Sequence, residues 1–191
     1  ENVLFSGERD RGVTITSQWT PQFQTVLGLL NGGGINNAYF PNADPTDGKD
    51  LVARARYSQG MIDGAVSYYS GRNSIPLAGE SYEHDKTRLG ADAQYYYALP
   101  ILGGGTLRGE FYSGTEVNPD SLKTLAPSQT LAEGNEKGHL ATDFTGWYAM
   151  AVQNIGDRLQ LAARYDTYDP NTDVEHDQYE RIGFGVNFFY D

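Results

Sequence analysis

The sequence predicts an all-β protein, an antiparallel up-and-down β-barrel of the membrane-spanning type. Apolar and polar residues alternate with a period of two in segments spread along the whole chain, which is the periodicity of a strand with one oily face. Short turns and long polar connections follow one another between these segments. Among 191 residues there are 23 Gly and 14 Tyr, a composition that favours strands over helices.

The first half of the chain holds four predicted strands, at residues 13–19, 22–32, 51–59 and 62–69. The third strand, LVARARYSQ, shows the pattern most clearly. Arg54 and Arg56 fall on one face of it, and the opposite face takes Leu51, Ala53, Ala55 and Tyr57. One face of this strand should therefore meet water and the other an apolar phase.

The second half holds five more predicted strands, at residues 88–99, 105–114, 143–154, 159–166 and 181–190. The segment 143–154 is apolar at both alternations, so its two faces are not assigned. A short further strand is expected at residues 2–6 (NVLFS). The whole chain, 1–191, is expected to form part of one barrel domain, with no second domain.

The connections are expected to differ in length between the two ends of the sheet. Four are short turns rich in Gly, Pro, Asn and Asp, at residues 18–22, 57–63, 99–105 and 154–158. Four are longer and polar, at residues 35–50, 71–86, 117–142 and 168–178. Short turns at one rim and long loops at the other are typical of an outer-membrane barrel.

A soluble β-sandwich would give the same alternation, so strand length and composition have to separate the two. Several strands approach ten residues, about the length that crosses a bilayer at a tilt. Aromatic residues gather near strand ends, as expected at membrane interfaces: Trp19, Tyr57, Tyr68, Tyr97, Phe188 and Tyr190. The oily faces also carry many small residues, which would fill a sandwich core poorly: Ala53, Ala55, Ala91, Ala93 and Ala163.

If the oily faces meet lipid, the polar faces line a water-filled lumen. The candidate pore-lining residues are Arg54, Arg56, Asp63, Arg88, Asp92, Arg108, Glu110, Arg164, Asp166 and Arg181. As a set, the recurring arginines could act as a charge filter. Each could equally pair with a carboxylate across the strands and only stabilise the wall. Both interpretations stay open at the level of sequence.

The sequence gives little support for nucleic-acid binding, metal binding or catalysis. The net charge of −11 disfavours nucleic acid as a partner, and the absence of cysteine excludes disulfides and thiolate metal sites. No Ser-His-Asp, zinc or glycosidase signature is present. We therefore expect no catalytic residues, no metal and no cofactor, and a protein that is not an enzyme.

Several motifs resemble the phosphate-selective porin O and P family. They are ERDRGV (8–13), KDLVARARY (49–57), LRGEFYSG (107–114) and GWYAMAVQNIGDRLQLAARYDTYDPN (146–171), of which the ending RYDTYDPN is the most specific. The resemblance implies a sixteen-stranded, homotrimeric porin of the Gram-negative outer membrane, embedded in lipid and lipopolysaccharide. Because nine or ten strands are fewer than sixteen, the chain is expected to be one part of such a barrel.

The function expected from this resemblance is passive diffusion of small polar solutes, including phosphate-like anions. No phosphate site is carried over, because the four lysines are scattered: Lys49, Lys86, Lys123 and Lys137. Two alternatives remain. One is a structural outer-membrane barrel that sheathes a partner such as a cytochrome or lipoprotein, and the other is a soluble β-sandwich that binds a ligand.

Overall fold

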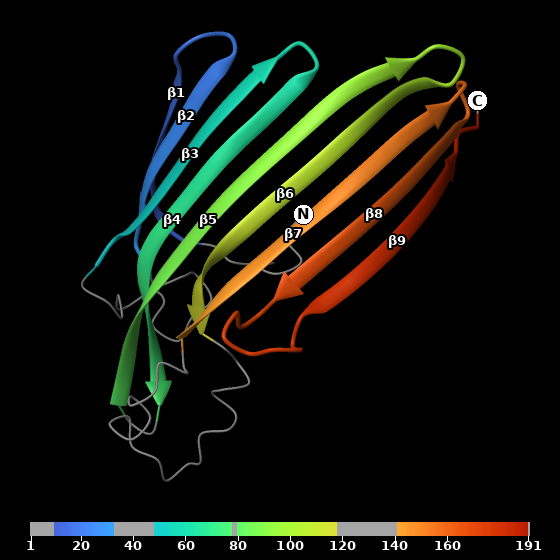
Figure 1. Cartoon of the computed structure of the whole chain (residues 1–191). Coiled ribbons are helices and arrows are strands. Elements are labelled where there is room, and N and C mark those ends of the chain that lie inside the picture. Colours follow the sequence, from blue (N-terminus) through green and yellow to red (C-terminus); the bar gives the residue numbers. More distant parts are fainter. Residues whose placement is uncertain (1–9, 33–47, 78–79, 118–140, 191) are drawn as a thin grey trace.

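Nine antiparallel strands form a single sheet in chain order (Figure 1). The computed structural model describes residues 10–32, 48–77, 80–117 and 141–190, which contain no helix long and apolar enough to cross a membrane. The strands are β1 (Gly12–Gln18), β2 (Phe23–Leu30), β3 (Asp50–Gln59), β4 (Ile62–Leu77), β5 (Glu80–Leu99), β6 (Gly103–Val117), β7 (Ala141–Ile155), β8 (Leu159–Asp169) and β9 (Tyr179–Phe188). The predicted all-β, up-and-down fold is confirmed. The strand predicted at 2–6 lies outside the described residues.

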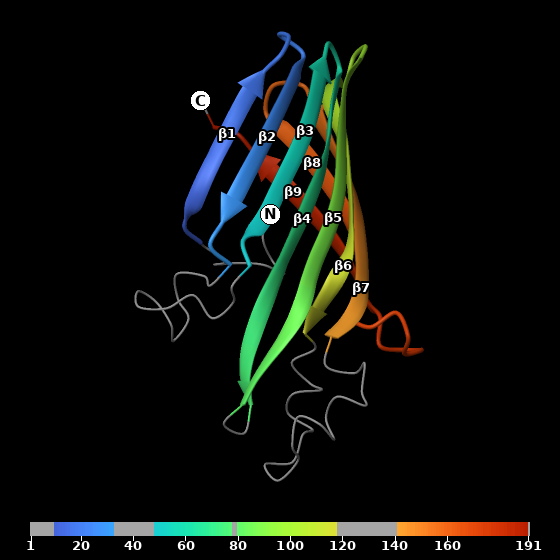
Figure 2. The ribbon, with the colours of Figure 1, turned by 90° about the vertical axis from the view of Figure 1, so that its left-hand side faces the viewer.

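The sheet is strongly curved, with one concave and one convex face (Figures 1 and 2). Each strand pairs with its neighbours in sequence, and β1 and β9 form the two edges of the sheet in the described part of the chain. No second sheet packs against either face within these residues. The architecture is that of a barrel wall, and it contradicts the β-sandwich alternative.

The short turns lie together at one end of the sheet, as predicted (Figure 1). They join β1 to β2, β3 to β4, β5 to β6 and β7 to β8. Gly60 and Gly156 adopt a φ of +59° in two of these turns, a conformation that glycine reaches without steric cost. Three of the other four connections, at the opposite end, are much longer.

The connection between β4 and β5 differs from the prediction. Residues 71–86 were expected to form a long loop, but the two strands continue as a paired hairpin from Gly71 opposite Lys86 to Leu77 opposite Glu80. This arm extends past the ends of the neighbouring strands (Figure 1). Its sequence lacks apolar alternation, so the periodic signal of a strand stops there while the backbone pairing continues.

The burial of side chains is inverted relative to a water-soluble protein. Phe184 is 83 % exposed, and Leu89, Leu107 and Leu161 are 40–50 % exposed, all on the convex face. Among the described residues only Ala65 and Phe144 are buried hydrophobics, and both lie on the concave face. These large apolar side chains therefore do not pack into a dry interior, and the convex face presents a continuous oily surface.

A buried carboxylate fixes the loop end of β3. Asp50 is 1 % exposed and accepts hydrogen bonds from the Tyr69 hydroxyl and from the backbone N–H of Arg72 at 3.1 Å. Gly32 and Gly71 pass so close to this carboxylate that a Cβ on either would press against it. The aspartate thus joins β3, β4 and the end of the β2 segment where the longer connections begin.

Candidate functional site

All ten candidate residues lie on the concave face of the sheet. Residues directly opposite each other in neighbouring strands share a face, and the register connects the ten without exception. Nine of them occupy three successive cross-strand rows. We call these nine the charged band: Arg54, Arg56, Asp63, Asp92, Arg108, Glu110, Arg164, Asp166 and Arg181. That the band lines a pore remains a prediction.

The middle row of the band runs across all nine strands. It contains, in order, Gln18, Gln24, Arg56, Ala65, Asp92, Glu110, Tyr148, Asp166 and Arg181. The band holds five arginines and four carboxylates in all. The sequence predicted that arginines recur on this face. In the sheet these arginines alternate with almost as many carboxylates.

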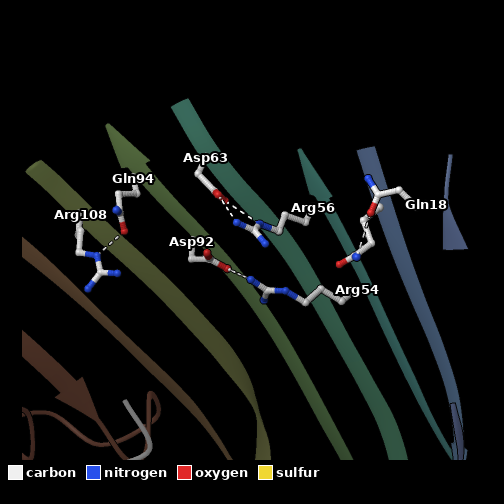
Figure 3. Close-up of polar contacts among 8 residues, drawn as sticks. Gln18, Arg54, Arg56, Asp63, Asp92, Gln94 and Arg108 are labelled. Atoms are coloured by element: carbon white, nitrogen blue, oxygen red, sulfur yellow. Dashed lines mark hydrogen bonds and ion pairs between the residues drawn. The ribbon is translucent and has the colours of Figure 1, made fainter. Parts of the chain in front are cut away.

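The ion pair of Arg54 and Asp92 reaches over a whole strand (Figure 3). Arg54 lies on β3 and donates to Asp92 on β5 at 2.8 Å, and to Ser67 on the intervening β4 at 2.6 Å. The strand beneath carries only small side chains there, Ala65 and Ser67. These leave the guanidinium room to lie flat across β4.

Two further arginines have carboxylate partners nearby. Arg56 donates through Nε to Asp63 at 3.0 Å and through a second, shorter contact to the same carboxylate, so the pair is bidentate (Figure 3). Arg164 donates through Nε to Asp166 at 2.8 Å, two residues along the same strand. The Arg164 guanidinium also lies 3.9 Å from the ring centroid of Tyr148, a cation–π contact.

Three members of the band have no oppositely charged partner within ion-pair distance among the described residues: Arg108, Glu110 and Arg181. Arg108 donates to the neutral side chain of Gln94 (Figure 3). Glu110 lies opposite Asp92 on one side and Tyr148 on the other. Arg181 lies on the edge strand β9, opposite Asp166, whose carboxylate is already bound to Arg164.

The tenth candidate, Arg88, lies one row nearer the loop end and belongs to a separate group. Arg88 contacts the Glu116 carboxylate, and the Lys86 ammonium lies 3.6 Å from the same carboxylate. Lys86 and Glu116 were missed by the sequence interpretation. The signal was present, because both residues continue the two-residue alternation of the polar faces of β5 and β6.

An aromatic cluster covers the concave face beside the charged band. The rings of Tyr112, Phe144 and Tyr168 lie with centroids 6.3–6.5 Å apart, and Tyr168 stacks on Tyr179 at 6.4 Å. Gly146 lies beneath the Tyr112 ring, where a Cβ would overlap it. This cluster was also missed, because the faces of the segment 143–154 could not be assigned from its sequence.

The band offers hydrogen bonding and charge. Its ionisable groups are arginines and carboxylates arranged mostly as pairs. Within the described part of the chain, no group of three or more His, Cys, Asp or Glu side chains is placed to hold a metal ion. What the arrangement can do is attract, orient or repel small charged solutes in water.

Comparisons with known proteins show the fold. The sheet is similar to that of a porin. That solved structure, refined at 1.8 Å resolution, matches with a TM-score of 0.60 at 13 % sequence identity. The match covers 97 % of this chain and 54 % of the porin chain, so the chain spans about half the length of the porin. No protein-family model matches the sequence, and no curated protein matches it.

Proposed function

We propose that the chain is part of an outer-membrane channel through which small polar solutes diffuse passively. The convex face would meet lipid, and the concave face, with its charged band, would line a water-filled lumen. The observation that carries this proposal is the inversion of burial: large apolar side chains are exposed over one entire face while arginines and carboxylates gather on the other. The likeness in fold to a porin supports it.

The polarity of the convex face fits a bilayer better than water. A soluble monomer seldom exposes a contiguous apolar patch of more than a few hundred Å². Here exposed apolar residues appear on every strand, from Val13 at 72 % to Val186 at 68 %. Near the short turns the exposed residues include aromatics, with Trp19, Tyr57 and Tyr190 at 66 %, 48 % and 88 %. Such a belt is expected where a barrel crosses a lipid interface.

The open edges of the sheet also bear on the proposal. In hydrocarbon an unpaired strand edge leaves backbone N–H and C=O groups without partners, at a cost of several kcal/mol for each group. A channel would therefore require further strands to pair with β1 and β9. The porin that this sheet resembles is about twice as long as the matched region, which leaves room for those strands. We propose, accordingly, a larger closed barrel of about sixteen strands.

Finer features of the porin O and P resemblance belong to the same proposal. They are assembly as a trimer, contact with lipopolysaccharide, and a preference for anions such as phosphate. The five arginines of the band support an anion preference, and its four carboxylates weaken it. Charge selectivity is therefore the part of the proposal that most needs a measurement.

The proposal is tested by conductance in planar lipid bilayers. The intact, purified protein should insert from detergent and give stable stepwise currents in KCl. A protein that inserts but conducts no ions would contradict a free channel and favour the alternative of a barrel that sheathes a partner. A protein that stays monomeric and soluble without detergent would contradict membrane insertion altogether.

A further inference from the structure

Resting on the proposed channel function, we infer that two adjacent charges on β6, Arg108 and Glu110, set the charge preference of the channel. The other arginines of the band between the sheet edges act mainly as halves of ion pairs. Paired and unpaired charges are told apart by the ion pairs in the structure, which the sequence does not reveal. These ion pairs reduce the ten candidate pore-lining residues to two that would determine charge selectivity.

The surroundings of Arg108 are electrically neutral on both sides. Gln94 lies directly opposite on β5 and Met150 directly opposite on β7. The guanidinium uses its Nε–H on the Gln94 oxygen and has no carboxylate within ion-pair distance among the described residues. Its positive charge, on an exposed side chain, is therefore uncompensated toward the concave space.

Glu110 is uncompensated for a related reason. It lies directly opposite Asp92, and two facing carboxylates repel each other. Arg54 reaches across β4 and binds Asp92, which leaves Glu110 as the carboxylate of this facing pair without a cation. On its other side Glu110 faces Tyr148, whose neutral hydroxyl hydrogen-bonds to Glu110 but supplies no positive charge.

The chain contains a matched counterexample two strands away. Arg164 and Asp166 have the same spacing on β8 and the same face, yet they form a direct ion pair at 2.8 Å. An ion pair is a dipole whose field falls off faster than that of a single charge. The β8 pair should therefore contribute little to selectivity. Arg108 and Glu110 do not form an ion pair with each other, so each should act on the ions that pass closest to it. Arg181 lies on the edge strand β9, whose second neighbour is not part of the described sheet, so the inference does not extend to it.

The test is the reversal potential of the intact protein in planar bilayers across a KCl gradient at low ionic strength. One unit charge about 7 Å from a passing ion in water changes its local concentration about threefold. Because the same charge repels cations and attracts anions by about that factor each, Arg108→Gln should raise the cation-to-anion permeability ratio by up to about ninefold, and Glu110→Gln should lower it by a similar factor. Arg108→Lys keeps the charge and should leave the ratio close to that of the unaltered protein.

Each control variant removes one arginine together with the carboxylate that it pairs with, so the net charge of the protein does not change. The double variants Arg164→Gln/Asp166→Asn and Arg54→Gln/Asp92→Asn should change the ratio much less than either single β6 variant. Equal shifts in the controls, or no shift in Arg108→Gln and Glu110→Gln channels that still conduct, would overturn the inference alone. Absence of conductance in the unaltered protein would overturn the channel proposal, and this inference with it.

Discussion

Asp50 shows how little space the loop end of the wall leaves for one additional atom. A Cβ on Gly71 would overlap the buried Asp50 carboxylate, which is already hydrogen-bonded to Tyr69 and to the backbone of Arg72. Gly71→Ala should therefore destabilise the folded protein by about 1–3 kcal/mol, the usual cost of overpacking a filled site. The measurement is urea unfolding of the protein refolded in lipid vesicles.

Gly183 provides the matched control for that experiment. It also lies within a strand, on β9, but a Cβ placed there has no heavy atom within 4 Å. Gly183→Ala should change the unfolding free energy by less than about 1 kcal/mol, and in the stabilising direction, because alanine loses less conformational freedom than glycine. Equal destabilisation by both variants would show that the Asp50 site is not tightly packed.

At the scale of the element, the arm formed by β4 and β5 should respond to acid. His84 is 6 % exposed, and burial lowers its pKa below the ordinary 6.5, although nearby Glu116 opposes this shift. As the pH falls below 6.5, the unfolded arm binds a proton that the folded arm resists. The stability contributed by neutral His84 is therefore present above that pH and is lost during acidification.

Hydrogen exchange can measure this effect locally. Protection of the β5 amides around His84 should be lower at about pH 5.5 than at about pH 7.5, after correction for the intrinsic exchange rates. A His84→Gln variant should lose most of this difference because it has no titrating ring. The idea would be refuted by a pH dependence that is the same in both proteins.

The elements also show what sequence can and cannot predict here. Strands with one oily face, such as β3 and β5, could be predicted together with the faces of Arg54 and Asp92, because a strand with one apolar and one polar face demands strict alternation. The face of Phe144 could not be predicted, since β7 is apolar on both sides and only the register with β6 resolves it. The ion pairs could not be predicted from the sequence either. Nothing in it shows that Arg54 reaches over β4 to Asp92, or that Arg108 contacts Gln94 and no carboxylate among the described residues.

For the whole molecule, the decisive question is which phase covers the convex face. Ile15 and Thr16 are neighbours on β1, both exposed, and they point to opposite faces. Ile15→Lys should cost about 2–4 kcal/mol if the convex face lies in the middle of a bilayer. In water the same exposed substitution would change stability by only about 0.5 kcal/mol.

Thr16→Lys is the internal reference, since it places the same charge one residue away on the concave side. It should be nearly neutral in the same vesicle-based unfolding experiment. Near-equal effects of the two lysines would show that both faces meet water. That result would remove the basis for the channel proposal, even though the sheet topology would stand.

The contact of Arg54 with Asp92 across β4 has a mechanical consequence. It acts as a tie on the inner side of a bent wall, so the wall cannot flatten there without stretching or breaking that link. Each transient release would also bare the Asp92 carboxylate beside Glu110. Bending of the sheet in this region should therefore change the charge that its concave face exposes beside Glu110.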